Sequence, residues 1–278
     1  MSMDTNTFIL TLLGLKGWGP NKIYNYIFKH SFVYEECVND LVNTLDETEK
    51  ADFKQILVKS KNILKKNYEL GVRAINIFDK LFPRKLYEKT DKCIFLYYKG
   101  DISLLSERSI AIIGTRKPTP DFIEKGVIAT RYFTKKGCVI VSGLAIGCDT
   151  IAHKICIENG GKTIAVLPSS CDNIYPAINK SLGELIVKNG GLLISEYSTG
   201  SLISKYNYVQ RDRIQSLLCS VILIIQASNE SGTMNATKKN IKDGKPVYAI
   251  SGNNLNIIKK YLDVNFQKEL EEVSNHIL

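Results

Sequence analysis

The sequence predicts an α/β protein in which a doubly wound, mostly parallel sheet follows a small N-terminal helical domain. From about residue 92 onward, short apolar segments alternate with amphipathic helical segments, a pattern typical of parallel sheets covered by helices. The apolar segments contain few polar residues, as expected for strands that are buried on both faces. Residues 4–70 instead place apolar side chains at helical spacing, which predicts helices there.

The N-terminal helices contain one segment that could have a function of its own. Between the first two helices lie Gly17 and Gly19, in a segment similar to the hairpin of a helix-hairpin-helix module. Such glycines can let backbone N–H groups approach a nucleic-acid phosphate. A tight glycine turn between packed helices accounts for the same residues, and we favour it. In that interpretation Trp18 is a core residue rather than a platform for stacking a base.

The elements of the sheet region can be assigned from the same alternation. Strands are predicted at residues 94–98, 109–113, 138–142, 163–167, 192–195, 221–226 and 247–250. Helices between them are predicted near residues 121–136, 149–159, 178–189, 208–218 and 232–243. Two further helices are predicted at residues 255–262 and 266–277, and the boundary with the N-terminal helices is expected within residues 70–90.

Charge is unevenly distributed along the chain. The 37 lysine and arginine residues exceed the 28 aspartate and glutamate residues, so the formal net charge is +9. Residues 1–70 have no net charge, whereas residues 71–100 carry +4 and residues 101–252 carry +6. The basic excess therefore belongs to the predicted sheet region. It favours an anionic partner there, although a solvated basic surface gives the same balance.

Composition argues against several classes of protein. The sequence has no apolar segment of about 18 residues to span a membrane, and residues 1–7 lack the pattern of a secretory signal. The seven cysteines are odd in number and form no Cys-x-x-Cys pair, so neither a zinc site nor a disulfide framework is expected. We expect a cytoplasmic protein without a metal site, in which Cys138 and Cys219 are small core residues.

The first candidate site follows the strand predicted at residues 109–113. Gly114 and Thr115 can present backbone N–H and hydroxyl donors, and Arg116 and Lys117 can reach the same anion. The segment is neither the glycine pattern of dinucleotide-binding proteins nor a Walker A loop. It fits an anion site, and it fits equally a glycine turn beside a surface arginine.

The second candidate site follows the next predicted strand. Ser142 ends that strand, Gly143 and Gly147 follow it, and Asp149 is placed to cap the next helix. His153 lies one turn further on the same helix face, so the two residues could form an acid–base pair. Because no nucleophile stands at triad spacing, we favour a structural role, in which Asp149 caps the helix and His153 packs at the end of the sheet.

Three later segments add cations or helix starts at the ends of strands. Lys180 follows a polar loop that contains Tyr175-Pro176. Arg211 and Arg213 flank Asp212, and the two arginines could clamp phosphates or form a local ion-pair network. A helix opens after a later strand with a geometry that suits phosphate binding, at Ser231, Gly232 and Thr233.

Taken in order, these segments resemble the motifs of the DprA/Smf family of bacterial DNA-processing proteins. The family pattern runs Gly-Ser/Thr-Arg, Ser-Gly-Leu-Ala-x-Gly-x-Asp-x-x-Ala-His, Gly-Gly-x-Thr-Ile-Ala-Val-Leu, Tyr-Pro, Leu-x-Ser-Glu-Tyr, Arg-Asn-Arg and Ser-Gly-Thr/Ser. The corresponding segments here are Gly114–Arg116, Ser142–His153, Gly160–Leu167, Tyr175-Pro176, Leu193–Tyr197, Arg211–Arg213 and Ser231–Thr233. The likeness covers residues 92–252 and, more weakly, residues 1–91.

The resemblance implies an extended Rossmann fold without a nucleotide cofactor, which binds single-stranded DNA at the carboxyl ends of the strands. It further implies a protein that is not an enzyme, a homodimer formed through the Rossmann-like domain, and help in loading RecA recombinase onto incoming DNA during natural transformation. By motif, phosphates would be held by Arg116, Lys180, Arg211 and Arg213, with Lys117 beside the first. Gly114, Thr115, Ser142, Gly143 and Gly147 would shape the pocket, and Ser231, Gly232 and Thr233 would donate from its rim.

The resemblance also implies a division into domains. It places a helical module at residues 1–75, a Rossmann-like domain at residues 76–255 and a short helical tail at residues 256–278, without the winged-helix domain of many family members. Three positions depart from the family pattern: Asp212 replaces an asparagine, Val209 replaces the proline that precedes the arginine motif, and Gln226 stands where glutamate is common. These departures leave open a divergent role, including one in a mobile element or a defence system.

Two other classes of protein share parts of this pattern. Nucleotide-ligand sensors and LOG-type phosphoribohydrolases have a similar sheet and a glycine-threonine helix start. In the hydrolases a catalytic glutamate follows that start, whereas Thr233 is followed here by Met234, Asn235 and Ala236. Ligand sensing therefore remains an alternative and hydrolysis is disfavoured. An NAD-dependent oxidoreductase is disfavoured because its glycine pattern is missing.

Overall fold

A computed structural model describes residues 3–88, 90–265 and 267–277 of the chain. Within these residues, one nine-stranded sheet has the order β1-β2-β6-β5-β4-β3-β7-β8-β9. All pairs from β6 to β9 in that order are parallel, and β2 runs antiparallel to both β1 and β6. The predicted α/β fold with a mostly parallel sheet is confirmed.

The strands are short, and most are buried along their whole length. They are β1 (Arg73–Asn76), β2 (Phe95–Gly100), β3 (Ser109–Ile113), β4 (Val139–Ser142), β5 (Thr163–Val166), β6 (Leu192–Ser195), β7 (Val221–Ile224), β8 (Val247–Ile250) and β9 (Lys260–Leu262). The bounds of β3, β6 and β8 are those predicted from the sequence, and the other predicted strands agree within three residues.

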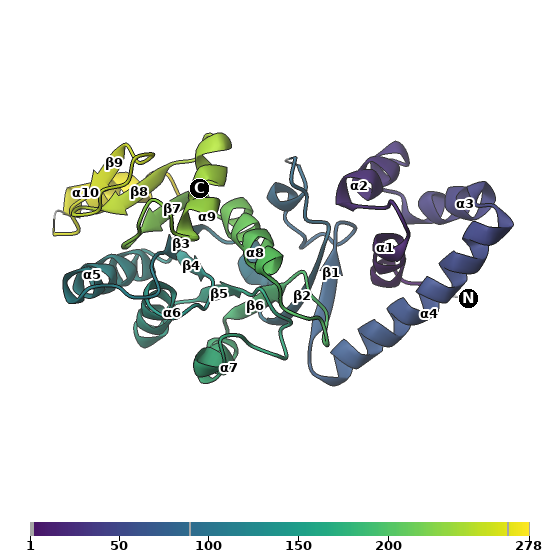
Figure 1. The fold of residues 1–278 in the computed structure, drawn as a ribbon, viewed down its shortest axis with the longest axis horizontal. Coiled ribbons are helices and arrows are strands. Elements are labelled where there is room, and N and C mark those ends of the chain that lie inside the picture. Colours follow the sequence, from purple (N-terminus) through teal and green to yellow (C-terminus); the bar gives the residue numbers. More distant parts are fainter. Residues whose placement is uncertain (1–2, 89, 266, 278) are drawn as a thin grey trace.

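The helices cover both faces of the sheet and form a lobe at its β1 edge. They are α1 (Thr5–Gly14), α2 (Pro20–Lys29), α3 (Tyr34–Thr44), α4 (Glu47–Glu69), α5 (Pro120–Lys135), α6 (Cys148–Glu158), α7 (Lys180–Lys188), α8 (Lys205–Leu218), α9 (Thr233–Lys242) and α10 (Gln267–Ser274). Figure 1 shows α1–α4 together at one end of the molecule and the sheet with its helices at the other.

Side chains of the central strands pack into two separate hydrophobic cores, one on each face of the sheet. On β3, Ile110 and Ile112 belong to one core, while Ala111 and Ile113 belong to the other. Helices α5, α6 and α10 cover the first of these cores, and α7, α8 and α9 cover the second, which continues into the N-terminal helices. This alternation is the pleat of a strand that is buried on both faces, and it makes the sheet doubly wound.

The N-terminal helices are fastened to the sheet at its β1 edge. Phe8 of α1 is fully buried in the core that extends to the sheet. The side chain of Asn76 on β1 donates hydrogen bonds to Thr5 and Asn6 on α1, at 3.1 and 2.8 Å. The domain boundary placed at residue 75 therefore falls inside β1, and the division of the chain into domains stays a prediction.

One predicted element at the C-terminal side is wrong. Residues 255–262 were expected to be a helix, but β9 lies there and pairs in parallel with β8. Leu262 is buried by this pairing, and the hydroxyl of Tyr261 bonds to both backbone groups of Leu255, at 3.0 Å each. Pairing with an existing edge strand satisfies backbone groups of residues too few to form a stable helix. The sequence also gave no sign of β1, which has four residues.

The remaining expectations concern burial and single segments. All seven cysteines are buried, which confirms Cys138 and Cys219 as core residues. Trp18 is partly buried against the core, as favoured above. The helix predicted at residues 266–277 is α10, although Phe266 lies outside the described residues. In the part of the chain that is described, no helix has the length and apolar character needed to cross a membrane.

Candidate functional site

The candidate site lies where the order of the sheet reverses. The connection after β3 leads to β4 on one side of it, and β7 adjoins β3 on the other side. In doubly wound sheets a crevice forms outside the carboxyl ends of the strands at such a point. A cavity of about 450 Å³ occurs here, and it is lined by residues of four segments: Gly114–Arg116, Ala145 with Asp149, residues 208–215 of α8, and the start of α9.

The turn after β3 is held tightly between two neighbours. The N–H of Thr115 donates to the carbonyl of Gln226 at 2.7 Å, and the carbonyl of Thr115 accepts from the N–H of Cys148 at 3.1 Å. A Cβ at Gly114 would lie 2.7 Å from the Gln226 carbonyl oxygen, so only glycine fits. Gly147, with φ of +82°, is packed against the backbone of Thr115 and Arg116. These contacts fix where the chain turns out of the sheet.

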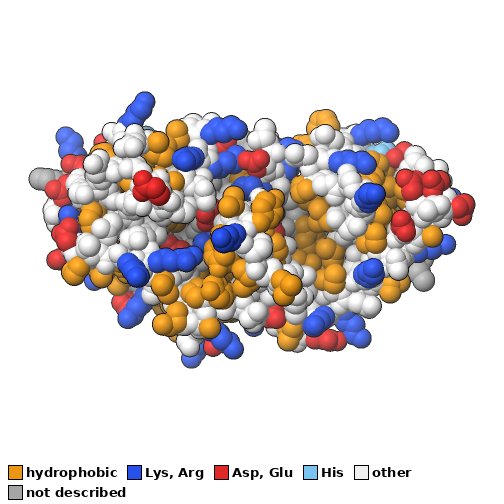
Figure 2. Space-filling view, viewed as in Figure 1, with side chains coloured by type: hydrophobic (Ala, Val, Ile, Leu, Met, Phe, Trp, Pro, Cys, Tyr) orange, Lys and Arg blue, Asp and Glu red, His pale blue; other side chains and the backbone are white. Residues whose placement is uncertain are grey.

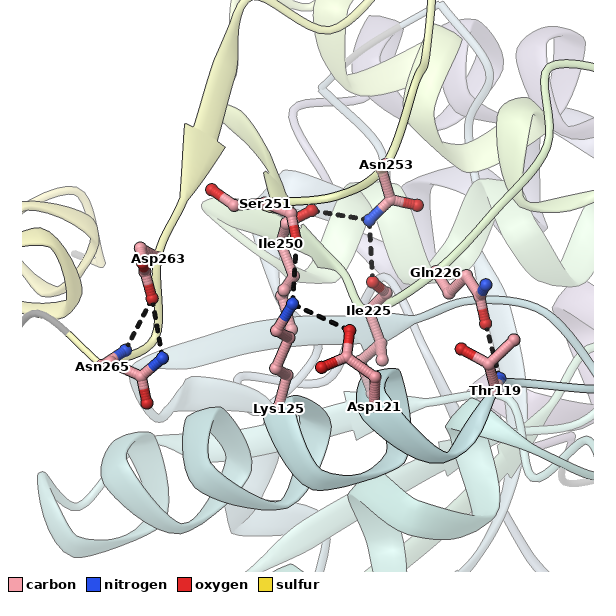
Figure 3. Close-up of polar contacts among 10 residues, drawn as sticks. All are labelled: Thr119, Asp121, Lys125, Ile225, Gln226, Ile250, Ser251, Asn253, Asp263 and Asn265. Carbon is pink, nitrogen blue, oxygen red and sulfur yellow. Dashed lines mark hydrogen bonds and ion pairs between the residues drawn. The ribbon is translucent and has the colours of Figure 1, made fainter.

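Gln226 holds the same loop a second time. Its side-chain oxygen accepts a hydrogen bond from the N–H of Thr119 at 2.9 Å, as Figure 3 shows. Beside it, Asn253 donates to the carbonyls of Ile225 and Ile250 and so joins the ends of β7 and β8. Gln226 therefore holds the loop through both its backbone carbonyl and its side-chain oxygen.

Arg116 is exposed at the rim of the cavity. Its guanidinium carbon lies 5.8 Å from the centre of the Tyr208 ring, and no ion pair is formed by Arg116 with the residues described. Lys117 follows, also exposed, and its N–H donates to the Thr115 hydroxyl at 3.3 Å. The rim therefore holds cations that are available to an anion.

The loop after β4 is organised by Asp149 and not by a helix cap. Gly147 is the N-cap residue of α6, and no side chain caps that helix. Asp149 lies in the first turn, and its carboxylate accepts from the N–H groups of Gly143 and Ala145 at 3.1 and 3.3 Å. The predicted cap is therefore wrong, while the structural role is retained. The reason is that the loop turns back over the helix start and offers its own N–H groups.

His153 is likewise structural. It is fully buried, and its Nδ1 lies 2.7 Å from the hydroxyl of Thr163 on β5. Burial and the nearby Arg211 charge lower the pKa of His153 to about 3, so the imidazole is neutral at physiological pH. It is not among the residues that line the cavity.

Arg211 joins three elements beneath the cavity. It is 8% exposed, and its Nη1 donates to the carbonyls of Gly143 and Val166. Its Nε donates to the carboxylate of the adjacent Asp212 at 2.9 Å. A guanidinium held by two carbonyls and a carboxylate has most of its donors occupied. Arg211 therefore lines the cavity chiefly as a support for it.

Two carboxylates lie in the wall of the same cavity. Asp149 is 5% exposed and Asp212 is 8% exposed. Burial raises the pKa of both carboxyl groups above the ordinary value, and the positive charge of Arg211 opposes that rise. The wall of the cavity is therefore rich in hydrogen-bond acceptors, while the free cations lie at its rim.

Arg213 is separated from Arg211 by the geometry of α8. Its guanidinium pairs with Glu196 and donates to the carbonyl of Asp91 at 2.8 Å. It lines a different cavity of about 560 Å³, between the start of α2 and the opposite face of α8. Residues two apart on a helix do not share a face. The two arginines are neighbours in the sequence motif, but in the structure they line different cavities.

Two other predicted residues lie at the edge of the site or beneath it. Lys180 is exposed at the start of α7, and it is not among the residues that line either cavity. Ser142 is buried, and its hydroxyl donates to the carbonyl of Ile112 at 2.7 Å, which ties β4 to β3. Ser142 therefore supports the loop without facing the cavity.

The start of α9 forms the far wall. Ser231, Gly232 and Thr233 line the cavity, and Gly232 precedes the helix. The hydroxyl of Ser231 donates to the carbonyl of Ser228 at 2.8 Å. Within the described residues, the N–H groups of Gly232 and Thr233 find no acceptor, so the positive end of the helix dipole is open to the cavity.

Several lining residues were not predicted as part of a site, and three of them carry polar side chains. Tyr208, Gln215 and Asn235 all face the cavity. Tyr208 also lines a small adjoining cavity with Tyr175. Spacing offered one signal, because Tyr208 and Gln215 stand three before and four after Arg211, which places them on one face of α8. On the face drawn in Figure 2, hydrophobic side chains gather in the region of α7 and α8.

Comparison with known proteins gives a consistent result. The family described as DNA recombination-mediator protein A matches residues 73–260. The DNA processing protein DprA of Streptococcus pneumoniae is 36% identical over 182 residues, which are 64% of this chain and 63% of that protein. DprA of Bacillus subtilis is 33% identical over 204 residues, or 73% of this chain and 68% of that protein.

Two solved structures are similar to the fold described above. The X-ray structure of DprA from Streptococcus pneumoniae has a TM-score of 0.74 and 26% identity, and the match covers 99% of this chain and 93% of that one. DprA from Helicobacter pylori, described as having a unique single-stranded DNA binding mode, has a TM-score of 0.64 and 28% identity, and the match covers 74% of this chain and 97% of that one.

These matches are extensive enough to establish the family, but they cover only part of the length of the relatives. The matched part spans 63% of the length of the Streptococcus pneumoniae protein. The family match covers more than half of this chain and includes β1, every parallel strand up to β8 and all four walls of the cavity. This chain therefore belongs to the DNA recombination-mediator protein A family, also called DprA/Smf.

Proposed function

We propose that this protein is a recombination mediator that binds single-stranded DNA at the cavity between β3 and β7. The observation that carries the proposal is the unpaired Arg116 at the rim, opposite the open N-terminus of α9. Both features suit phosphates. The single-stranded DNA binding described for the related Helicobacter pylori protein supports the same function.

The rest of the rim fits a single strand better than a duplex. Tyr208 lies beside Arg116, and Tyr175, which lines the small adjoining cavity with Tyr208, is 46% exposed. Single-strand binding proteins combine a basic path for the backbone with aromatic rings on which unpaired bases stack. The bases of a duplex are already stacked on one another and cannot use such rings. We therefore propose that phosphates contact Arg116, Lys117 and the start of α9, while bases contact the tyrosines.

The finer parts of the proposal come from membership of the family. We propose that the protein forms a homodimer through the Rossmann-like domain, protects incoming DNA and helps to load RecA during natural transformation. Lys180 and Arg213 remain proposed phosphate contacts that lie outside this cavity. We propose no catalytic role for Asp149 or His153, because hydrogen bonds to the loop and to Thr163 occupy them.

The test is a salt titration of DNA binding. Fluorescence anisotropy of a labelled oligo-dT should show binding at low salt, and the logarithm of the association constant should fall linearly with the logarithm of the salt concentration. A duplex of equal length should bind more weakly at every salt concentration. Absence of binding to the single strand at low salt would refute the proposal. Molar mass in solution tests the dimer, and RecA filament formation on protein-coated single strands tests RecA loading.

A second candidate function is supported by the carboxylates in the cavity. Asp149 and Asp212 line it, although no acidic residue directly follows Thr233. A nucleotide-ligand sensor, or a LOG-type phosphoribohydrolase in a mobile-element or defence context, would use such a cavity for a free nucleotide. Incubation with a panel of nucleoside monophosphates decides between these functions. Release of free base would establish the hydrolase, and binding without release would favour the sensor.

A further inference from the structure

The cavity between β3 and β7 presents an unusual set of polar groups in its wall. Asp212 and Gln215 both line it, and they stand one turn apart on the same face of α8. Gln215 is 2% exposed, and its Nε2 has no hydrogen-bond partner among the residues described. A buried amide without a partner is rare and requires an explanation, such as a ligand that completes it.

The carboxylate of Asp212 can also accept further hydrogen bonds. One oxygen accepts from Nε of Arg211 at 2.9 Å, and the side chain of Asn235 lies beside the group. An ionised carboxylate has about four lone-pair sites for donors. Asp212 can therefore accept further hydrogen bonds from a ligand in the cavity. Asp149, which also lines the cavity, is already an acceptor for Gly143 and Ala145.

This combination disfavours a phosphate inside the cavity. Two buried carboxylates would face the phosphate charge, while the Nε and Nη1 donors of Arg211 are turned toward Asp212 and toward two carbonyls. A neutral group with several donors fits better, because buried acceptors are costly unless they are paired. The nucleobases are the neutral, hydrogen-bonding parts of DNA, and proteins read unpaired bases along their Watson–Crick edges.

The four bases differ in how they meet such a wall. Guanine carries two adjacent donors, N1–H and the N2 amino group, beside one acceptor, O6. A carboxylate can accept from both donors at once, while a neighbouring amide donates to O6. Thymine has a single N–H between two carbonyl oxygens, so one of its oxygens would face the carboxylate. Asp212 and Gln215 therefore match guanine best and thymine worst.

We propose that Asp212 and Gln215 make this cavity selective for a guanine nucleotide. The inference rests on the proposed function, because single-stranded DNA is the source of that nucleotide. The base would contact Asp212 and Gln215, and its phosphate would reach Arg116 and the start of α9 at the rim. A site that hydrogen-bonds its ligand discriminates strongly against ligands that lack the matching groups.

The test compares the bases in two forms. Calorimetry measures binding of dGMP and dTMP, and anisotropy measures binding of oligo-dT with and without one central guanine. Wild-type protein should prefer the guanine ligand by about tenfold, as for one good base contact. Asp212→Asn should reduce that preference to below about threefold, since an amide oxygen still supports Arg211 but one acceptor becomes a donor.

Two further variants keep the result interpretable. Gln215→Met removes the amide at similar size and should weaken guanine binding without improving thymine binding. Glu158→Gln removes one negative charge at the far, exposed end of α6 and should leave the preference unchanged. Equal binding of guanine and thymine by the wild type, or an unchanged preference in both Asp212→Asn and Gln215→Met, would overturn the inference.

The two forms of ligand separate this inference from the proposed function. If oligonucleotides bind without preference for guanine, the inference fails and the proposed function stands. If dGMP binds selectively but oligonucleotides do not bind, base selectivity stands and the cavity serves a free nucleotide. If the mononucleotides bind too weakly to measure, the two oligonucleotides decide. If neither form binds, both proposals fail.

Discussion

The guanidinium of Arg211 lies directly against the backbone of Gly143. A Cβ at residue 143 would lie 1.6 Å from Nη1 of Arg211, so this position excludes every residue larger than glycine unless Arg211 moves. The same nitrogen donates to the carbonyl of Gly143 and, at 3.3 Å, to that of Val166. Helix α8 is thereby joined to the ends of β4 and β5. The shape of the cavity depends on this close approach.

Gly143→Ala should destabilise the fold. The added methyl group must displace a buried guanidinium from its hydrogen bonds to the carbonyls of Gly143 and Val166, and overpacking of this kind costs about 1–3 kcal/mol. Urea unfolding followed by circular dichroism measures the loss. Gly19→Ala is the matched control, since a Cβ there meets nothing within 4 Å. Equal stability of the two variants would show that Arg211 moves aside without cost.

Arg116→Ala should weaken binding of single-stranded DNA and leave stability unchanged. Arg116 is exposed and forms no ion pair with described residues, so its removal should alter the free energy of unfolding by less than about 0.5 kcal/mol. Loss of one phosphate contact should also make the dependence of affinity on salt less steep, by about 0.7 in the logarithmic slope. Anisotropy over a range of salt concentrations measures both effects.

Arg131→Ala provides the control for that measurement. Arg131 is an exposed residue of α5 and lines neither the candidate cavity nor the cavity beside Arg213. Its removal changes net charge by the same amount but should leave the slope near that of the wild type. If both variants lose the same affinity, binding depends on overall charge and not on the candidate site.

Stability should fall on mild acidification because of His153. Its pKa in the folded protein is about 3, against 6.5 in an unfolded chain. Between these values the unfolded chain takes up a proton that the folded protein does not, so unfolding is favoured as the pH falls. This group should account for a loss of about 2 kcal/mol between about pH 7.5 and about pH 5.

A variant isolates this contribution from the carboxylates nearby. Asp149 and Asp212 have raised pKa values, so they bind protons more readily when folded and act in the opposite direction. His153→Asn should therefore show a flatter dependence of unfolding free energy on pH than the wild type. The measurement is urea unfolding at several pH values. Parallel profiles for the two proteins would contradict the assignment.

Asn253→Ala should destabilise the edge of the site. The Asn253 amide donates to the carbonyls of Ile225 and Ile250, and its oxygen accepts from the N–H of Ala227 at 2.9 Å. Loss of such partners from a partly buried position costs about 1–3 kcal/mol. Asn265→Ala is the control, because the exposed Asn265 bonds, among the residues described, only to Asp263. Thermal unfolding compares the two, and similar melting temperatures would count against this role for Asn253.

Local patterns in the sequence were sufficient for most of the fold. The strands β3, β6 and β8 are continuous apolar segments with polar residues or glycine at their ends, and such segments have few alternatives in an α/β protein. Strand β9 was predicted as a helix because its three residues show no period of their own. Its structure comes from pairing with β8, a contact that no local pattern records.

The family resemblance, the order of the central elements and the glycine turns at the ends of the strands could all be predicted from local sequence patterns. Which charged groups meet depends on how distant elements pack together. The tertiary structure placed Arg211 under the cavity and paired Arg213 with Glu196, although the two arginines are neighbours in the motif. It also brought Asp149 and Gln215 into one wall with Asp212. The physical reason is that motif spacing reports on the backbone, whereas burial and partners depend on elements that are distant in the sequence.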